Sequence, residues 1–398
     1  VKKKVPELRF KGFTDEWEQR KLGDEVRIVM GQSPNSENYT DDPNDYILVQ
    51  GNADMKNGRV LPRVWTTQVT KQAEKDDLIL SVRAPVGDIG KTAYDVVIGR
   101  GVAAIKGNEF IFQSLGKMKS DGYWTRYSTG STFESINSTD IKEAIISVPA
   151  IEEQDKIGSF FQQLDETIAL HQRELDNLKI TKQVFMKKMF PKEGEKVPEV
   201  RFPGFMADWD YRKLGDVGET YTGLSGKSKD DFGHGRGKYV TYMNVFSNSI
   251  ANPSLVELVE IDTKQNEVNP GDIFFTTSSE TPEEVGMSSV WLENSDNTYL
   301  NSFCFGYRPI EKFDNYYLAY MLRSSVVRKK ITFLAQGISR YNISKNKVMD
   351  IAVPIPVIEE QTKIGEFFKQ LDDIINLQQQ ELEKLKQTKQ AFLQKMFI

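Results

Sequence analysis

Few residues of this chain are of the types that usually carry out catalysis. It contains two histidines, His171 and His234, and one cysteine, Cys304, in 398 residues. Zinc sites are built mainly from histidine and cysteine ligands, so these numbers disfavour a zinc centre. His234 lies in the glycine-rich stretch FGHGRG, where a solvated loop histidine is the simplest interpretation. A single cysteine allows no disulfide within the chain, which fits a reducing environment.

One stretch, YTGLSGKS at 221–228, ends like a phosphate-binding loop. Tyr221 stands where the G-x-x-x-x-G-K-[ST] pattern has its first glycine, and no apolar strand run precedes it. The chain has no G-x-S-x-G, no G-x-G-x-x-G and no [ND]PP[YF] amino-methylation motif. Glu152 and Glu153 are an acidic pair at a predicted helix start, where the helix dipole favours them. The sequence therefore predicts a chain that is not an enzyme and has no metal site.

Two motifs occur twice, and they define the organisation of the chain. Residues 149–190 and 356–397 are identical at 27 of 42 positions, and residues 5–24 and 197–216 at 13 of 20. We call the shorter repeat the lead motif. The repeating unit is a lead motif, a body and a long helix, which predicts two domains on a duplicated frame.

The bodies, roughly 25–148 and 217–355, show little similarity to each other except near their ends. There GSTFESIN (130–137) and GISRYNIS (337–344) keep the same offset of 207 residues as the helices. Short apolar runs between turn residues predict strands at 47–49, 77–82, 102–107, 144–149, 272–277 and 302–307. Helical spacing over 313–331 predicts one helix with a basic end.

Each repeated helix carries an apolar seam. Its residues recur at alternating steps of four and three, which is the pattern of a coiled coil. At about 1.5 Å per residue each helix would be roughly 50 Å long. The short linker 191–196 cannot lead the chain back along such a helix, so an antiparallel pair with one domain at each end is expected. The predicted interface consists of Ile157, Phe161, Leu164, Ile168, His171, Leu175, Leu178, Phe185 and Met189, and of Ile364, Phe368, Leu371, Ile375, Gln378, Leu382, Leu385, Phe392 and Met396; Lys182 and Lys389 continue the spacing.

The expected fold class is α+β. Two mixed α/β globular domains are separated by two long antiparallel coiled-coil helices, in a pseudo-two-fold internal repeat. The predicted boundaries are 1–148 for the first body with its lead motif, 149–196 for the first helix and linker, 197–355 for the second body with its lead motif, and 356–398 for the second helix.

This organisation resembles the specificity subunit of type I restriction–modification systems. The resemblance covers the whole chain in organisation and rests on the repeated VPE-RF-GF…W…RKLGD lead motif and P-x-IEEQ-KIG-FF-QLD helix. It implies two target recognition domains, each reading one half of a split target in double-stranded DNA. It also implies that the helices act as a spacer and dock two modification (methyltransferase) subunits, with restriction (nuclease/translocase) subunits as further partners. S-adenosylmethionine and ATP are then expected in those partner subunits, and no cofactor in this chain.

Contacts to bases and phosphates call for polar and basic side chains on loops. In the first body these are Gln32, Ser33, Asn35, Asn52, Lys56, Asn57, Arg59, Arg83, Arg126, Ser131 and Thr132. In the second body they are Lys227, Ser228, Lys229, Arg236, Lys238, Ser278, Ser279, Arg340, Tyr341 and Asn342. Arg328, Lys329 and Lys330, at the basic end of the predicted helix, are expected to clamp a phosphate, although cations at a helix end also have a dipole explanation.

Two other functions stay open at this point. A net charge of −5 with a pI near 5.5 fits a coiled-coil scaffold whose two domains bind proteins or glycans. A stand-alone nucleic-acid enzyme is the third interpretation, which the missing motifs disfavour. The N-terminus has basic residues without an apolar stretch, and the longest apolar run, near 351–358, is too short to span a bilayer. We therefore expect a cytoplasmic protein without a membrane partner.

Overall fold

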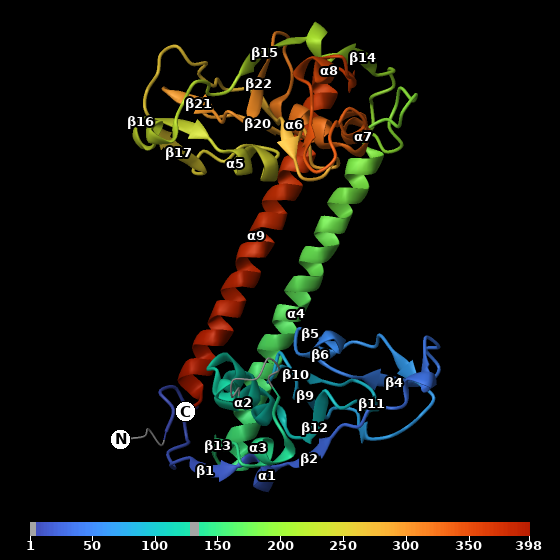
Figure 1. The fold of residues 1–398 in the computed structure, drawn as a ribbon, viewed down its shortest axis with the longest axis vertical. Helices are drawn as coiled ribbons and strands as arrows, with labels where there is room; N and C mark the ends of the chain where they lie inside the picture. The colour runs from blue at the N-terminus through green and yellow to red at the C-terminus, as the bar shows by residue number, and fades with distance from the viewer. Residues whose placement is uncertain (1–4, 128–134) are drawn as a thin grey trace. The chain divides into compact units, whose positions relative to one another are not determined.

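The computed structural model describes residues 5–127 and 135–398, which form two compact units. The first unit holds the chain up to Gln172 together with Gln380–Ile398, and the second holds Arg173–Gln379. The long helices α4 (Ile151–Lys188) and α9 (Ile358–Met396) each begin in one unit and end in the other (Figure 1). Within the described ranges, no helix combines the length and apolar character needed to cross a membrane.

The first unit is built around two sheets. One has the strand order β2 (Arg27–Met30), β12 (Val102–Lys106), β9 (Leu78–Ser81), β10 (Ile89–Lys91), β6 (Arg59–Val60) and β5 (Met55–Lys56). The other has the order β3 (Tyr39–Thr40), β7 (Trp65–Thr66), β4 (Tyr46–Val49), β11 (Val96–Ile98) and β8 (Gln72–Ala73). The helical segments are α1 (Leu22–Glu25), η1 (Ser36–Asn38), η2 (Asn52–Asp54), α2 (Glu109–Ser120), η3 (Tyr123–Tyr127) and α3 (Ser138–Lys142).

The second unit has the same plan with different loops. One sheet has the order β15 (Gly218–Thr222), β22 (Cys304–Pro309), β18 (Ile273–Thr276) and β20 (Ser288–Val290), and another has β17 (Val256–Val259), β16 (Phe232–Val240) and β21 (Thr298–Leu300). A small pair joins β19 (Ser278–Ser279) to β23 (Tyr341–Asn342). The helical segments are η4 (Leu214–Asp216), η5 (Lys229–Asp231), α5 (Tyr242–Ser247), α6 (Asn315–Arg323), α7 (Ser325–Phe333) and α8 (Lys345–Met349).

The two bodies share one strand plan despite their dissimilar sequences. The all-antiparallel order β2-β12-β9-β10 in the first unit matches β15-β22-β18-β20 in the second. The parallel pair β4–β11 likewise matches β16–β21. All six predicted strands are present, as β4, β9, β12, β13 (Ile145–Val148), β18 and β22. The duplication therefore includes the bodies, where sequence identity no longer shows it.

The predicted helix over 313–331 is wrong in one respect, because it is two helices. Asp314 caps the start of α6 by accepting a hydrogen bond from the Tyr317 backbone N–H. Ser324 then takes an extended conformation (φ −63°, ψ 152°) and separates α6 from α7. Arg323, the last residue of α6, donates to the backbone oxygens of Val245 and Ser288. These bonds tie the end of α6 to the body and fix the break.

In each unit the long helices run antiparallel, as the seams predict. In the first unit Phe160 of α4 packs on Phe392 of α9, with ring centroids 5.0 Å apart. In the second unit Phe185 of α4 packs on Phe367 of α9 at 5.1 Å. All eighteen predicted seam residues are buried or half-buried.

The two lysines on the seam form ion pairs across each helix pair. Lys389 pairs with Asp165 in the first unit, and Lys182 with Asp372 in the second. The same carboxylates accept hydrogen bonds from the bodies, from Gln113 of α2 and from the Tyr320 hydroxyl of α6 respectively. The seam is therefore locked to the adjacent body in each unit.

The lead motifs hold the start of a long helix in each unit. Arg9 forms two hydrogen bonds to the Glu153 carboxylate, at 2.6 and 2.8 Å, and Arg201 does the same to Glu360 at 2.7 and 2.8 Å. Both carboxylates are only 1% exposed. The hydrogen bond to the glutamate raises the pKa of each arginine. The second glutamate of IEEQ is thus a structural anchor for the lead motif.

The strands and aromatic rings of the lead motifs complete this frame. β1 (Glu18–Lys21) pairs antiparallel with β13, and β14 (Asp210–Lys213) with β24 (Ala352–Ile355). The ammonium of Lys156 lies 5.0 Å from the Phe13 ring, and that of Lys363 lies 5.0 Å from the Phe205 ring. The repeated residues therefore have structural partners in both units.

Candidate nucleic-acid interface

In the second unit, five of the predicted contact residues lie together on the β19–β23 pair. Ser278 is opposite Asn342 and Ser279 is opposite Tyr341 in the antiparallel register. Arg340 donates from Nη2 to Ser278 Oγ at 3.2 Å. Ser278 is only 5% exposed, so its hydroxyl positions Arg340 rather than facing solvent. Arg340 and Asn342 are exposed and offer donors and acceptors of the kinds that read base edges.

The first unit has the corresponding bridge between Arg83 and Ser135. The backbone N–H of Ile136 donates to Val82 O at 3.0 Å, as that of Ile343 donates to Thr277 O in the second unit. Arg83 is exposed. Ser131 and Thr132, also predicted here, lie outside the described residues.

The loop that follows the first body strand comes close to this region in both units. A methyl group added at Gly31 would lie 2.1 Å from Gly99 O, and one added at Gly223 would lie 2.2 Å from Asn301 O. Only glycine fits either position, which explains the G-x-S of both MGQS and TGLS. The YTGLSGKS stretch therefore contains a close backbone crossing at its first glycine.

Ser33, next to the Gly31 crossing, accepts a hydrogen bond on Oγ from the Arg100 backbone N–H at 3.1 Å. Asn52 of η2 lines a shallow cavity of about 570 Å³ together with Arg63 and Ala84, next to Arg83. Gln32 and Asn35 extend this loop with exposed side chains. Arg63 and the exposed Arg100 were not predicted as contacts. Arg100 stands between two glycines in IGRG, a pattern that could have indicated an exposed turn.

A second group of predicted residues lies on the β5–β6 hairpin and on strand β16. Lys56, Asn57 and Arg59 are exposed at the turn between β5 and β6, where Asn57 (φ 53°) and Gly58 (φ 73°) form the tip. Arg236 and Lys238 are exposed on β16 of the second unit.

The loop 227–229 of the second unit is partly engaged inside the fold. Lys227 pairs with Asp262 at 2.9 Å, and this hydrogen bond lowers the pKa of Asp262 to about 2. Ser228 donates from its backbone N–H and from Oγ to the Asp231 carboxylate, whereas Lys229 is exposed. Lys229 is the member of this loop best placed to meet a ligand.

Two of the three residues predicted to clamp a phosphate have hydrogen-bond partners inside the fold. Arg328 donates to the backbone oxygens of Glu283, Val285 and Gly286, so its guanidinium is occupied, and burial lowers its pKa to about 10. Lys330 donates to Ala352 O at 2.8 Å. Lys329 is exposed.

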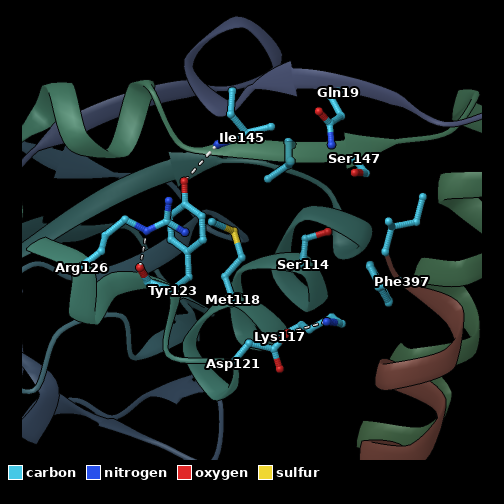
Figure 2. A pocket seen from close by; sticks show the side chains of 12 residues that line it. Gln19, Ser114, Lys117, Met118, Asp121, Tyr123, Arg126, Ile145, Ser147 and Phe397 are labelled. Atoms are coloured by element: carbon cyan, nitrogen blue, oxygen red, sulfur yellow. Dashed lines mark hydrogen bonds and ion pairs between the residues drawn. The ribbon is translucent and has the colours of Figure 1, made fainter. Parts of the chain in front are cut away.

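Arg126 lies on the frame rather than beside the Arg83 bridge residues. Its guanidinium stacks on the Tyr123 ring at 3.6 Å, and its Nε donates to Tyr123 O. It lines a cavity of about 500 Å³ formed by α2, η3, β1, β13 and the end of α9, with Phe397 on its far side (Figure 2). The second unit has a cavity of about 570 Å³ at α7, α8 and β24, lined by Lys329, Lys330, Lys347, Glu193 and Ala352 among others.

Outside the gaps at 1–4 and 128–134, no group of three or more His, Cys, Asp or Glu residues is arranged to hold a metal ion. His234 is exposed, and its ring nitrogens contact Glu260 Oε1 at 3.0 Å and Asp230 O at 2.6 Å, which raises its pKa. What the described residues provide is two polar and basic loop surfaces on one duplicated frame. These features define a protein with two recognition domains.

Comparison with known proteins agrees with this description. The family model of the type I restriction modification DNA specificity domain matches residues 14–179 and again 206–387. The chain belongs to this family.

The relatives and a solved structure extend over different parts of the chain. A putative type I restriction enzyme MjaX specificity subunit from Methanocaldococcus jannaschii is 31% identical, over 43% of this chain and 42% of its own length. The MjaVIII specificity subunit of the same organism is 22% identical over 95% of this chain and 91% of its own length. The type I S subunit from M. genitalium has the same fold, with a TM-score of 0.63, 15% identity and 99% of both chains covered.

Proposed function

We propose that this chain is the DNA-reading subunit of a type I restriction–modification complex, and that each body reads one half of a bipartite target in double-stranded DNA. The observation that carries this proposal is the shared strand plan of two bodies whose surface loops differ. A constant frame with variable loops is what two independent readers of different base sequences require.

The helices would set the gap between the half-sites. α4 has 38 residues and α9 has 39. At about 1.5 Å per residue either is more than 50 Å long, enough to pass one helical turn of duplex DNA at about 34–36 Å. Domains held by such a spacer could face the same side of the duplex.

The partners would be two modification subunits, which carry S-adenosylmethionine, and restriction subunits, which use ATP. Two modification subunits are supported by the duplicated frame, because Arg9 and Glu153 in the first unit and Arg201 and Glu360 in the second form the same anchor at the start of a long helix. The chain itself would recognise DNA without catalysis and without a cofactor. The same proposal divides the chain into a first body with its lead motif, a first helix with its linker, a second body with its lead motif, and a second helix, with the boundaries 1–148, 149–196, 197–355 and 356–398.

The test is to co-express the chain with a modification subunit and map methylated adenines in cellular DNA. A split motif is the expected result. No modification would favour a scaffold, activity of the chain alone would favour an enzyme, and a continuous motif would contradict two independent readers.

Inserting one heptad into each helix tests the spacer. The insertion keeps the seam in register and lengthens each helix by about 10 Å, or roughly three base pairs. We expect both half-sequences to persist with one to three more base pairs between them and lower activity, because about 100° of added rotation must be absorbed by the DNA. A folded, active variant with an unchanged gap would show that the helices do not set it.

A further inference from the structure

The segment from Gln336 to Asn342 closes on itself as a narrow hairpin. The Gln336 N–H donates to Asn342 O at 2.9 Å, and the Asn342 N–H donates to Gln336 O at 2.8 Å. Gly337 has a φ of 150°, and a methyl group there would lie 2.0 Å from Arg340 O, so the turn requires glycine. Ile338, at the tip, is 95% exposed. The hairpin therefore holds an apolar side chain out in solvent on a closed turn.

Arg340 in the same hairpin is held in place by the body. Its guanidinium hydrogen-bonds Ser278 Oγ at 3.2 Å and lies 6.0 Å from the ring of Phe303, which is itself 54% exposed. These contacts reduce the entropy that the arginine would lose on binding. The hairpin thus combines an exposed apolar tip with an oriented guanidinium.

We propose that this hairpin enters the major groove of the half-site read by the second body, where Ile338 packs on the C5-methyl group of a thymine. This inference rests on the proposed function. The major groove admits a two-stranded ribbon, and the thymine methyl is the apolar group on the base edges there. Arg340 then donates to O6 and N7 of a guanine in the same half-site, the commonest specific contact of arginine.

The two bodies differ at these positions. The 207-residue offset places Ser131 and Phe133 of the first body where the second has Ile338 and Arg340. A reader with serine in place of isoleucine gains nothing from a thymine methyl. The contact between an isoleucine and a thymine methyl is therefore expected in the second half-site.

The experiment uses the complex of the full chain with its modification subunit and begins with the wild-type adenine-methylation motif. Synthetic duplexes then replace each thymine of the second half-site in turn with deoxyuridine, which lacks only the methyl group. At one position we expect wild-type methylation to slow by about fourfold, the value of one buried methyl group. Ile338→Ser should methylate the thymine and deoxyuridine duplexes equally, and Arg340→Lys should lose preference at a guanine position.

Ile310→Ser is the matched control, because Ile310 is also an exposed isoleucine (64%) but follows the opposite end of β22 from Phe303. It should keep the wild-type response to deoxyuridine. Equal rates on all duplexes for the wild type, or a second half-site without thymine on either strand, would overturn the inference while leaving a bipartite motif intact. Failure of the wild-type complex to yield any bipartite motif would instead overturn the proposed function.

Discussion

The repeated KIG sequence leads to a prediction whose sign can be worked out from the structure. Gly158 and Gly365 lie inside the long helices, where glycine normally costs about 1 kcal/mol relative to alanine. A methyl group at Gly365 would lie 2.4 Å from Asp314 Oδ1 and 2.8 Å from the Tyr317 backbone nitrogen, and one at Gly158 would lie 2.9 Å from Glu109 Cβ. Both glycines therefore allow the first turn of a body helix, α6 or α2, to approach the long helix.

Gly365→Ala should destabilise the second unit despite the gain in helix propensity. Forcing a methyl group into a packed contact costs about 1–3 kcal/mol. Displacing the Asp314 cap of α6 costs about 0.5–2 kcal/mol more. After subtracting the propensity gain of about 1 kcal/mol, the expected net loss is about 0.5–4 kcal/mol. Gly116→Ala in α2 is the control, because a methyl group there meets nothing within 4 Å and should stabilise the first unit.

Cys304 allows the second unit to be observed by itself. It is the only cysteine of the chain, lies on β22 and is 3% exposed, and burial raises the pKa of its thiol. The thiolate is the form that reacts with an alkylating reagent. Because the Cys304 thiol is buried and protonated in the folded unit, alkylation requires the unit to open. A loss of about 0.5–4 kcal/mol predicts alkylation about 2- to 700-fold faster in Gly365→Ala, at 1.4 kcal/mol per factor of ten.

Gly158→Ala and Gly116→Ala should leave the alkylation rate of Cys304 unchanged, because both lie in the first unit. Urea unfolding followed by tryptophan fluorescence compares the overall stability of these two variants with that of the wild type. If Gly365→Ala stabilises the protein as Gly116→Ala does, the close approach is not a determinant of stability and the explanation of KIG is refuted.

Three further outcomes are expected. Arg201→Ala should lower the free energy of unfolding in urea by about 3–5 kcal/mol, because it leaves the buried Glu360 carboxylate unpaired. Arg212→Ala breaks an exposed ion pair and should lower it by about 0–1 kcal/mol. Equal losses in the two variants would contradict the anchoring role of Arg201. Lys227 lowers the pKa of Asp262, so the stabilising effect of this carboxylate is present above about pH 4 and lost towards pH 2. The difference in unfolding free energy between wild type and Asp262→Asn should therefore shrink as the pH falls over that range. A constant difference would argue against the ion pair. The chain alone, at pI 5.5, should bind DNA weakly and in a salt-sensitive manner, and much more tightly with a modification subunit; equal affinities at matched salt would count against the complex.

The sequence predicts the frame well because local rules define it. Heptad spacing identifies the seam, and none of its eighteen residues, all within the described ranges, is exposed. The six strand predictions are confirmed because short apolar runs between turn residues are unambiguous at that length. Strand order could not be predicted, because periodicity contains no information about which strands pair. The break at Ser324 was missed for a related reason, since the bonds of Arg323 that hold it connect segments 35 to 78 residues apart.

The candidate interface was harder to predict, because residue type alone does not show whether a polar side chain is free. Arg328 and Lys329 are adjacent basic residues of one helix, yet the first is committed to three backbone oxygens and the second is exposed. Conversely, Arg100 becomes a candidate only when the fold places it beside Ser33. Burial and partner geometry decide such cases, and both depend on the tertiary fold.

The way the frame is shared between the units explains how the bodies can differ so much. The same contacts recur in both units, among the lead motif, the start of one long helix and the end of the other. The N–H of Leu8 donates to Lys395 O in the first unit, and that of Val200 donates to Lys188 O in the second. Among the elements through which the body meets this frame is a helix, α2 or α6, whose first turn lies against Gly158 or Gly365. Loops on the sheets, such as the Ile338 hairpin, make none of these frame contacts. Their residues can therefore change without disturbing these frame contacts, which is the physical condition that the proposed independent reading of two target halves requires.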